Sequence, residues 1–400
     1  MSERSSGALT GVRVLDLTRL LPGGFATALL SDLGAEVVKI EQPRIGDYMR
    51  WKEPRYGGTS AQSWITDRGK RSLAIDLKNP RGADAFKRLI ADADLLVESF
   101  RPGVMARLGL GYEDVRDLNP RLVYCSISGY GQDGPAAQEA GHDINYIGRA
   151  GVLSITGTAD RPAIPGVQVA DLGGGALMSL VGMLSALVHA RVTGEGDHVD
   201  VSMTDGAFAW LSVQLGIHFA TGKSPGREAV LLNGGFPCYN VYECADGRWL
   251  TVGAIEDQFF KALCDGVGRP DLVPTHMDPE AVGTWRALFL QQPRDEWLNL
   301  LAGTDACVGP VNDFAEAAAD PQLRHRRMVV ETEDAGGERR RQLGPPIKLL
   351  NRPPAVHSPP PRLGEHTEAY LSEAGIRRDE LAGLLRDGVA EAPEQSSAVP

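Results

Sequence analysis

The chain has 400 residues, of which 42% are hydrophobic and 23% charged, the balance of a soluble globular protein large enough for two or three domains. Its 41 basic and 52 acidic residues give a formal net charge of −11, which argues against general binding of nucleic acid or of anionic membranes. An anionic ligand therefore requires a local basic pocket.

The cysteines and the apolar stretches narrow the class further. The five cysteines form no C-x-x-C pair and have no histidine at zinc-binding spacing, so we expect reduced thiols and no metal site. Residues 1–11 contain no apolar signal core, and the best membrane-spanning candidate, Leu177–Ala190, is too short to cross a bilayer. We expect a cytoplasmic protein that has no membrane and no nucleic acid as partner.

The first part of the chain alternates short apolar runs with helical stretches. A helix is expected over Phe25–Leu33, after the breaker Pro22-Gly23-Gly24, and another over Arg81–Ala93. Strands are expected over Val12–Leu17, Glu36–Glu41, Ser72–Leu77, Asp94–Ser99 and Leu122–Ser126. This alternation predicts an α/β fold with a Rossmann-like parallel sheet covered on both faces. The turn after the first strand lacks the G-x-G-x-x-G spacing, so we expect no nicotinamide cofactor.

The second part changes from long helices to a small α+β region. Its expected elements are helices over Asp171–Ala190 and Asp205–Ala220, a strand over His198–Met203, a hairpin over 239–255, and helices over Asp257–Val267, Arg294–Leu301, Thr367–Ala374 and Arg378–Leu385. We therefore expect a large domain from 1–203 and 331–400, a linker helix over 204–233 and a small domain over 234–330. The last residues, 392–400, are expected to be disordered.

Several stretches of the sequence match a known family. They are LTGVRVLDLTRLLPGGFATALLSDLGAEVVKIEQP, DRGKRSLAIDLKNPRG, SFRPGVMARLGLG, AGHDINYIGRAGVLSITG, ADLGGGALM, LLNGGFPCYNVYECADGRWLTVGAIEDQF and PPPRLGEHTEAYLSEAGI. Together they resemble the family III CoA-transferases over nearly the whole chain. GHDINY and NGGFPCY…VGAIEDQF resemble the α-methylacyl-CoA racemase branch, and the agreement of two distant segments makes this signal specific.

The resemblance implies an architecture. Members have a large Rossmann-like domain made of both chain ends and a small α+β domain. Two chains interlock as a homodimer, with the active site between the large domain of one chain and the small domain of the other.

The resemblance also implies catalytic residues. Racemising the carbon beside a thioester carbonyl needs an acid/base group on each face and donors for the enolate oxygen. The matching positions are His142 and Asp171 as the two bases and Glu256 as the carboxylate partner of the histidine. The backbone N–H of Asp143, at the start of a helix opened by Gly141-His142-Asp143, would point at the thioester oxygen.

Each of these residues also has a simpler structural interpretation. A histidine between Gly141 and Asp143 suits a helix start, Asp171 suits the N-cap of the helix that contains three glycines, and Glu256 suits the first turn of the helix that follows it. The resemblance favours the catalytic interpretation, because all of them lie inside matching stretches.

The CoA moiety of an acyl-CoA substrate is the expected ligand, and we expect no other cofactor. Its phosphates need cations. Lys70 also lies in a matching stretch, although a lysine is usually just a solvated surface charge. The expected binding residues are Gln42, Arg71, Ile75, Asp76, Lys78, Arg101, Arg107, Gly141, Asn145 and Tyr146. Gln42 stands where racemases often carry arginine. The segment IGDYMRWKEPRYGGTSAQSW, residues 45–64, is longer than in racemases and is similar to that of transferases.

Two other functions stay open. A true CoA-transferase would use Asp171 as a nucleophile that forms a mixed anhydride and then an aspartyl-CoA thioester. Such an enzyme has no need of His142 with Glu256, which favours the racemase. A non-catalytic CoA-binding protein would require a decayed acid/base set, and here the set is intact.

Overall fold

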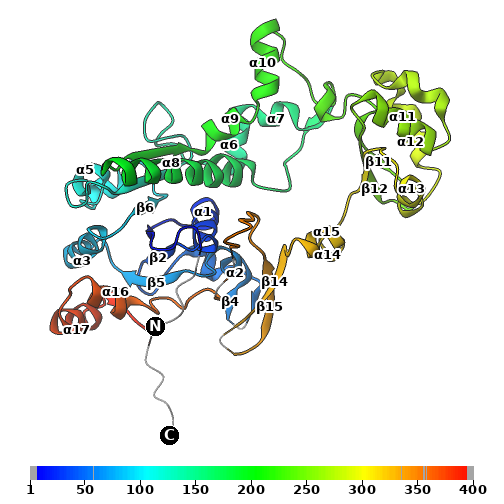
Figure 1. The fold of residues 1–400 in the computed structure, drawn as a ribbon. Coiled ribbons are helices and arrows are strands. Elements are labelled where there is room, and N and C mark those ends of the chain that lie inside the picture. Colours follow the sequence, from blue (N-terminus) through cyan, green and yellow to red (C-terminus); the bar gives the residue numbers. More distant parts are fainter. Residues whose placement is uncertain (1–6, 57, 335, 355, 357, 394–400) are drawn as a thin grey trace. The chain divides into compact units, whose positions relative to one another are not determined.

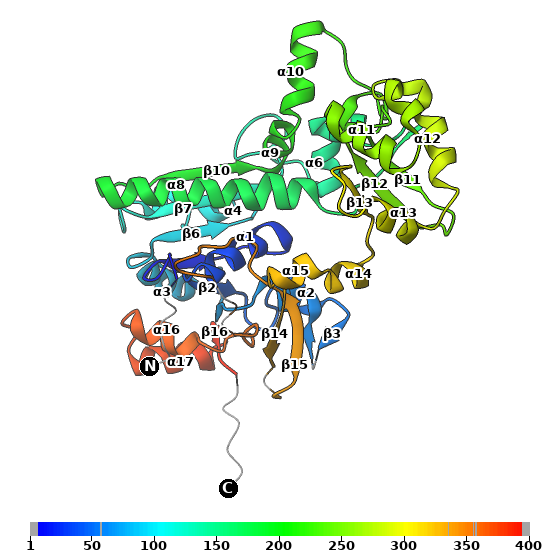
Figure 2. The ribbon, with the colours of Figure 1, turned by 45° about the vertical axis from the view of Figure 1, so that its right-hand side comes forward.

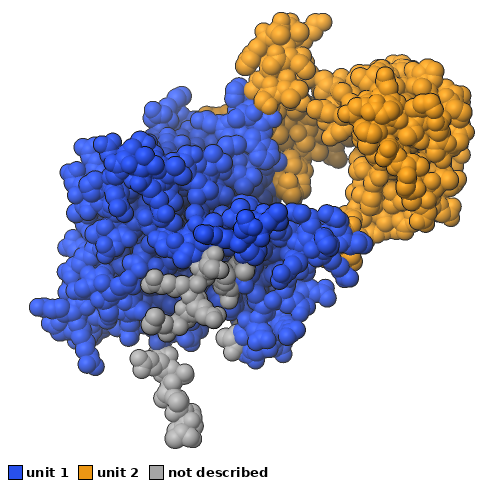
Figure 3. Space-filling view, viewed as in Figure 1, with its two compact units in different colours: residues 1–146, 168–210, 321–400 blue, residues 147–167, 211–320 orange. Residues whose placement is uncertain are grey.

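The computed structural model describes residues 7–56, 58–334, 336–354, 356 and 358–393. The chain divides into two compact units: unit 1 comprises residues 1–146, 168–210 and 321–400, and unit 2 comprises residues 147–167 and 211–320 (Figure 3). The expected domain boundaries stay a prediction; residues 147–167, assigned from sequence to the large domain, here pack with unit 2. The expected disorder of residues 392–400 falls mostly outside the described residues.

Unit 1 is built on a mostly parallel sheet, as predicted. Its seven strands run in the order β10-β7-β6-β1-β2-β5-β16 (Figure 1). Six are parallel: β1 (Arg13–Asp16), β2 (Glu36–Glu41), β5 (Arg71–Ile75), β6 (Leu95–Glu98), β7 (Val123–Ser128) and β10 (His198–Ser202). The short edge strand β16 (Ala390–Glu391) pairs antiparallel with β5. The chain runs outward from β1 in both directions, so the strand order reverses between β1 and β6, where α/β sheets bind their ligands.

Helices surround this sheet. In chain order they are α1 (Leu21–Asp32), η1 (Tyr48–Trp51), α2 (Ala61–Thr66), α3 (Pro80–Ile90), α4 (Val104–Arg107), α5 (Tyr112–Val115), η2 (Val169–Leu177), α8 (Met178–Thr193), α9 (Met203–Ala209), α15 (Pro321–His325), α16 (Thr367–Glu373) and α17 (Arg378–Arg386). Two small hairpins complete the unit, β3–β4 (Arg55–Tyr56, Thr59–Ser60) and β14–β15 (Val329–Glu333, Arg339–Leu343). Helix α6 (Asp143–Ala150) begins in unit 1 and ends in unit 2.

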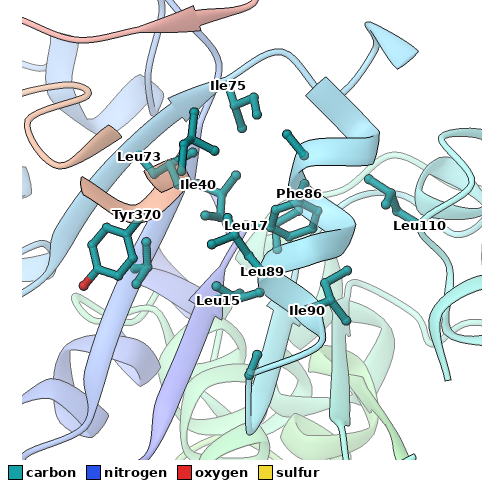
Figure 4. Packing of buried hydrophobic residues seen from close by; sticks show 14 of the residues in the cluster. Leu15, Leu17, Ile40, Leu73, Ile75, Phe86, Leu89, Ile90, Leu110 and Tyr370 are labelled. Carbon is teal, nitrogen blue, oxygen red and sulfur yellow. The ribbon is translucent and has the colours of Figure 1, made fainter. Parts of the chain in front are cut away.

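One hydrophobic core explains why the strands and α3 form where they do. Asn79 caps α3 through the N–H of Arg81, and Phe86, Leu89 and Ile90 project from one face of the helix. These side chains pack on buried strand residues such as Leu15, Leu73 and Ile75, and Tyr370 and Leu384 of the C-terminal helices close the same core (Figure 4). Burial of this kind contributes about 25 cal/mol per Å² of apolar surface.

The structure corrects two helix predictions. Helix α1 begins at Leu21 rather than Phe25, because proline is tolerated in a first turn and Gly23 and Gly24 lie inside the helix. A side chain at Gly23 would meet Thr18 at 2.2 Å, so glycine here serves close packing and not a break. The single helix expected over 205–220 is two helices, α9 and α10 (Ser212–Thr221), since Leu211 leaves helical geometry at their junction.

The long apolar helix also differs from expectation. Val169–Thr193, which is η2 continued by α8, has 25 residues and is long and apolar enough to cross a membrane, so the expectation that it is too short was wrong. Length is a weak argument for a membrane span, because core helices of soluble proteins pass the same test. Here 44% of the apolar window is buried, and α8 lies along β7 and β10 (Figure 2).

Unit 2 contains a small antiparallel sheet with helices on it. The sheet consists of β11 (Tyr239–Glu243), β12 (Trp249–Gly253) and β13 (Val308–Pro310), and the first two form the expected hairpin. Its core includes Tyr242, Phe260, Trp285, Phe289 and Trp297. The other elements are α7 (Val152–Ile155), β8–β9 (Gly157–Thr158, Arg161–Pro162), η3 (Leu231–Asn233), α11 (Asp257–Gly266), η4 (Pro270–Thr275), η5 (Pro279–Ala281), α12 (Val282–Phe289), α13 (Arg294–Leu301) and α14 (Phe314–Ala319).

Candidate active site

The start of α6 carries the first predicted base. His142 is the exposed residue that precedes the helix, and its carbonyl accepts the N–H groups of Asn145 and Tyr146. The side chain of Asn145 accepts the N–H of His142 in return, at 3.1 Å. This reciprocal cap fixes the backbone of the histidine while its side chain stays free of the cap. Asn145 therefore has a structural role at the place where the sequence predicted a ligand contact.

Asp143 joins this helix start to the start of η2. Its Oδ1 accepts the backbone N–H of Ala170 at 2.7 Å and that of Asp171 at 3.0 Å. A carboxylate at these positions satisfies two amides that a helix leaves unpaired and lies at the positive end of the helix dipole. Asp143 thereby holds together two helix starts that are 27 and 28 positions apart in sequence. His142, which precedes Asp143, and Asp171, whose N–H Asp143 accepts, lie on either side of the Asp143 carboxylate.

This arrangement changes the acidity of Asp171. Burial and the negative charge of Asp143 raise the pKa of Asp171 to about 6, and the nearby His142 lowers it in part. A carboxyl group with a pKa near 6 exchanges a proton readily at neutral pH, which suits general acid/base chemistry. This shift in the pKa of Asp171 could not be predicted from the sequence, because it depends on two helix starts that meet only in the folded chain.

The three glycines after Asp171 set the position of η2. Gly174 lies against Gly206 of α9, where a Cβ on Gly206 would come within 2.4 Å of the Gly174 Cα. A Cβ on Gly173 would meet the Trp210 ring at 2.4 Å. Only glycine permits this approach of backbones. The glycine run therefore anchors the segment that carries Asp171.

Tyr146 lies near the carboxylates of Asp171 and Asp143. Its hydroxyl donates to the carbonyl of Gly141 at 2.6 Å, and its ring lies edge-on to Tyr130 with centroids 5.1 Å apart. Burial and the carboxylate of Asp171 raise the pKa of Tyr146 to about 12, so its hydroxyl stays protonated. A Cβ on Gly141 or Gly129 would collide with the ring, which explains the glycine in the motif.

Four of the ten predicted CoA-binding residues follow the carboxyl ends of the parallel strands. Gln42 follows β2, Asp76 and Lys78 follow β5, and Arg101 follows β6. The side chain of Asp76 accepts the N–H of Lys78 and so shapes that turn. The exposed Arg101 and Lys78 are available to an anion. Arg107 is also exposed, at the end of α4.

Three other cation or ligand candidates do not offer a free side chain at these strand ends. The side chain of Ile75 is buried in the hydrophobic core, so only its backbone can face a ligand. Arg71 begins β5 and therefore lies at the opposite end of that strand from Asp76. Lys70 is fully buried and pairs with Asp16 at 2.9 Å and Asp67 at 3.5 Å, so it holds the fold together and is not free for a phosphate.

Arg19 is a candidate that the sequence analysis missed. It lies after β1, at the point where the strand order reverses. Its backbone N–H donates to Ser99 Oγ at 3.0 Å, and its guanidinium lies over the rings of Phe100 and Tyr48, at 5.2 and 5.5 Å from their centroids. The partners are far apart in sequence, and only the strand order, which brings β1 beside β6, reveals the site.

Glu256 belongs to unit 2, so its partnership with His142 stays a prediction. It is exposed and precedes α11 without capping the helix through its side chain. His276 contacts residues before and after Glu256. One of its ring nitrogens lies 3.2 Å from the carbonyl oxygen of Ala254, and the other lies 3.0 Å from Asp257 Oδ1. Within the described residues, no group of three or more His, Cys, Asp or Glu could hold a metal ion.

Comparison with known proteins gives the family. The model of the CoA-transferase family III matches residues 9–367. Human α-methylacyl-CoA racemase is 38% identical over 397 residues, which cover 96% of this chain and 98% of the relative. Human succinyl-CoA:glutarate CoA-transferase is 34% identical, with 96% of this chain and 90% of the relative covered. A CAIB/BAIF family protein from Brucella suis has the same fold, with a TM-score of 0.80, 32% identity and 92% of this chain and 99% of that one covered. The chain belongs to the CoA-transferase family III.

Proposed function

We propose that the protein is an α-methylacyl-CoA racemase, which interconverts R and S 2-methylacyl-CoA thioesters by removing and returning the proton at C2. The observation that carries this proposal is the meeting of the helix starts at His142 and Asp171, with the shared Asp143 carboxylate between them. Two proton carriers of different chemistry held near each other are what such a reaction needs.

The proposed reaction starts with the transfer of the C2 proton to one of the two bases. The electron pair moves to the thioester oxygen and forms an enolate. The other base then gives a proton to the opposite face of C2. After one turnover the two groups have exchanged protonation states, and proton exchange with solvent restores them.

The enolate oxygen needs a donor, and the start of α6 offers one. Within the described residues the structure records no acceptor for the N–H of Asp143, which lies in the first turn of this eight-residue helix. We propose that it donates to the thioester oxygen. Loss of one such donor in other enzymes raises the barrier by about 2.7–4 kcal/mol.

Deuterium incorporation tests the proposal. One enantiomer of a 2-methylacyl-CoA is incubated with the enzyme in deuterated water, and we expect deuterium at C2 together with mixed configuration. His142→Ala should slow exchange from one face by about a hundred- to ten-thousand-fold. His325→Ala, an exposed histidine at the end of α15, is the matched control and should exchange normally. Normal exchange in His142→Ala would remove the role assigned to that residue.

A CoA-transferase is the second candidate, since a transferase relative is 34% identical to this chain. A transferase forms a covalent thioester between Asp171 and CoA, whereas a racemase only carries a proton there. Mass spectrometry of the enzyme during turnover with an acyl-CoA and a free acid should find no adduct on Asp171. Glu256→Gln should reduce racemisation by removing the charge expected to stabilise protonated His142. An Asp171–CoA adduct, or normal CoA transfer by Glu256→Gln, would replace the racemase with the transferase.

We also propose that the enzyme is an interlocked homodimer in the cytoplasm. Val181, Val188 and Val192 of α8 are 62%, 65% and 81% exposed and recur at helical spacing, so an apolar face of this helix lacks cover among the described residues. A partner chain would bury it. Light scattering should give a dimer at every dilution that leaves the protein folded, and a stable folded monomer would contradict the proposal.

A further inference from the structure

A large cavity in unit 1 is separate from the groups assigned to catalysis. Its volume is about 1050 Å³, and its walls come from residues 44–56 and 58–64 after β2, from residues 334, 336, 338 and 340 of the β14–β15 hairpin and its turn, and from the proline-rich residues 358–366. None of His142, Asp143 and Asp171 lines it, and of the predicted CoA-binding residues only Arg71 does. The cavity thus gives a common location to the long segment 45–64 and the proline-rich segment, which the proposed reaction does not use.

The cavity wall is cationic in an acidic protein. Seven arginine or lysine residues line it against three aspartate or glutamate residues, an excess of four in a chain whose net charge is −11. Several of these cations are neutralised, such as Arg50 by Glu41 and Arg340 by Asp334. The side chains of Arg44 and Arg71 form no close ion pair in the described part of the chain, although the charge of Arg71 helps to lower the pKa of the half-buried Glu36. Two guanidinium groups outside a close ion pair therefore remain in the wall.

His366 leaves the charge of Arg71 in place. Its ring nitrogen lies 3.3 Å from Arg71 Nη1. Burial and the Arg71 charge lower the pKa of His366, so the ring is neutral at physiological pH and adds no negative or positive charge. A planar guanidinium beside a neutral ring is suited to a carboxylate or a phosphate.

Trp64 of α2 supplies an independent observation. This wall residue is 2% exposed, and its indole Nε1 has no hydrogen-bond partner among the described residues. Unpartnered buried donors are uncommon in folded proteins, because burial removes water without replacing it. Tyr56 lies edge-on to Trp64 with centroids 6.1 Å apart, and Arg340 lies 5.6 Å from the centre of the Tyr56 ring. The donor thus lies within a wall of aromatic rings and cations.

We propose that this cavity is a second ligand site, which takes a small organic anion with a flat ring. The acidic group pairs with the guanidinium groups of Arg44 and Arg71, the Trp64 N–H donates to an oxygen of the ligand, and the ring lies against Trp51 and Tyr56. A carboxylate and a phosphate ester share this chemistry, and the experiment separates them.

The test is equilibrium binding of phenyl phosphate and of benzoate to the full chain, measured by calorimetry with and without saturating CoA. At least one of the two should bind equally well in both conditions. The tighter of the two identifies the acidic group. Failure of both to bind, or displacement by CoA, would overturn the proposal, and displacement would assign the cavity to the substrate. Neither result would affect the racemase proposal, which rests on exchange at C2.

Substitutions locate the binding. Arg44→Gln, on an exposed side chain, and Trp64→Phe, which keeps a ring but removes the N–H, should each weaken binding by about tenfold or more. Arg377→Gln is the control, since Arg377 is exposed in unit 1 and lies outside the cavity wall. Circular dichroism checks that the variants fold, and the exposed Arg44 variant keeps the test valid if Trp64→Phe does not. Unchanged binding in Arg44→Gln would refute the site.

Discussion

The raised pKa of Asp171 predicts that this proposed catalytic group destabilises the folded protein. Asp171 ionises in the unfolded chain near pH 3.8 and in the folded chain near pH 6. A carboxyl group whose pKa is raised on folding lowers the free energy of unfolding as the pH rises from the unfolded value to the folded one, and the full loss is present above it. Asp171→Asn keeps the shape of the side chain and removes this charge.

The magnitude follows from the shift. Roughly two pKa units at about 1.36 kcal/mol each give an upper bound of about 3 kcal/mol. Asp171 is only partly buried, so solvent screening reduces the expected gain to about 1–2 kcal/mol. Asp171→Asn should therefore be more stable than the wild type by this amount at pH 8. The gain should shrink as the pH falls through 6 and disappear near pH 4.

Urea unfolding at several pH values and one fixed protein concentration measures this difference, because oligomer stability depends on concentration. Asp117→Asn is the control, since the side chain of Asp117 is 96% exposed, and it should give no gain that depends on pH. The same Asp171→Asn protein should have lost racemisation, with deuterium exchange at C2 slowed from the face that Asp171 serves. Two results would refute the raised pKa of Asp171: equal stability of Asp171→Asn and wild type at pH 8, or a gain in stability that persists at pH 4.

Four further substitutions test other parts of the structure. Asp143→Asn keeps an oxygen for the η2 amides but removes the charge that raises the pKa of Asp171, so the acidic limb of the pH–rate profile should move to lower pH. Lys70→Met removes the lysine that pairs with the buried Asp16 at 2.9 Å and leaves Asp67 with Lys39 as its lysine partner, and it should cost about 3–5 kcal/mol in urea unfolding. Burial raises the pKa of Glu98 to about 7, so wild-type stability falls as the pH rises from about 4.5 through 7; Glu98→Gln should unfold at higher urea at pH 8, by about 2–3 kcal/mol, with no gain at pH 4.5. Gly206→Ala forces a methyl group into η2, which should cost about 1–3 kcal/mol of stability and, in the exchange assay, slow turnover by displacing Asp171.

Sequence patterns located most of the regular elements, because these follow local rules. Glu36–Glu41 and Arg294–Leu301 have the predicted bounds, and helix α8 ends at Gly194 in the left-handed conformation expected of a C-cap. The hairpin β14–β15 was missed, because its second strand reads RRRQL and lacks apolar alternation. Cross-strand pairing compensates: Glu331 lies opposite Arg341 and Glu333 opposite Arg339, which places opposite charges side by side.

The sequence predicted the individual residues of the candidate site but not the contacts that hold them together. His142 at a helix start follows from its local sequence, and the structure places it there. The bond from Asp171 to Asp143 could not be predicted, because it depends on η2 packing against α9 through Gly174 and Gly206. Tertiary packing of this kind leaves no periodic signal in the chain.

The carboxylate pair also bears on the choice between the two reactions. Asp143 lies beside Asp171 and raises the pKa of Asp171, and the same negative charge would oppose a free carboxylate that approaches an acylated Asp171. A transferase must admit such an acid, and like charges in a partly buried site are costly to bring together. A racemase handles only a thioester, whose reacting end is neutral, and it gains from an aspartate that holds and releases a proton near neutral pH. The charge of Asp143 is therefore an argument for the proposed proton transfer at Asp171.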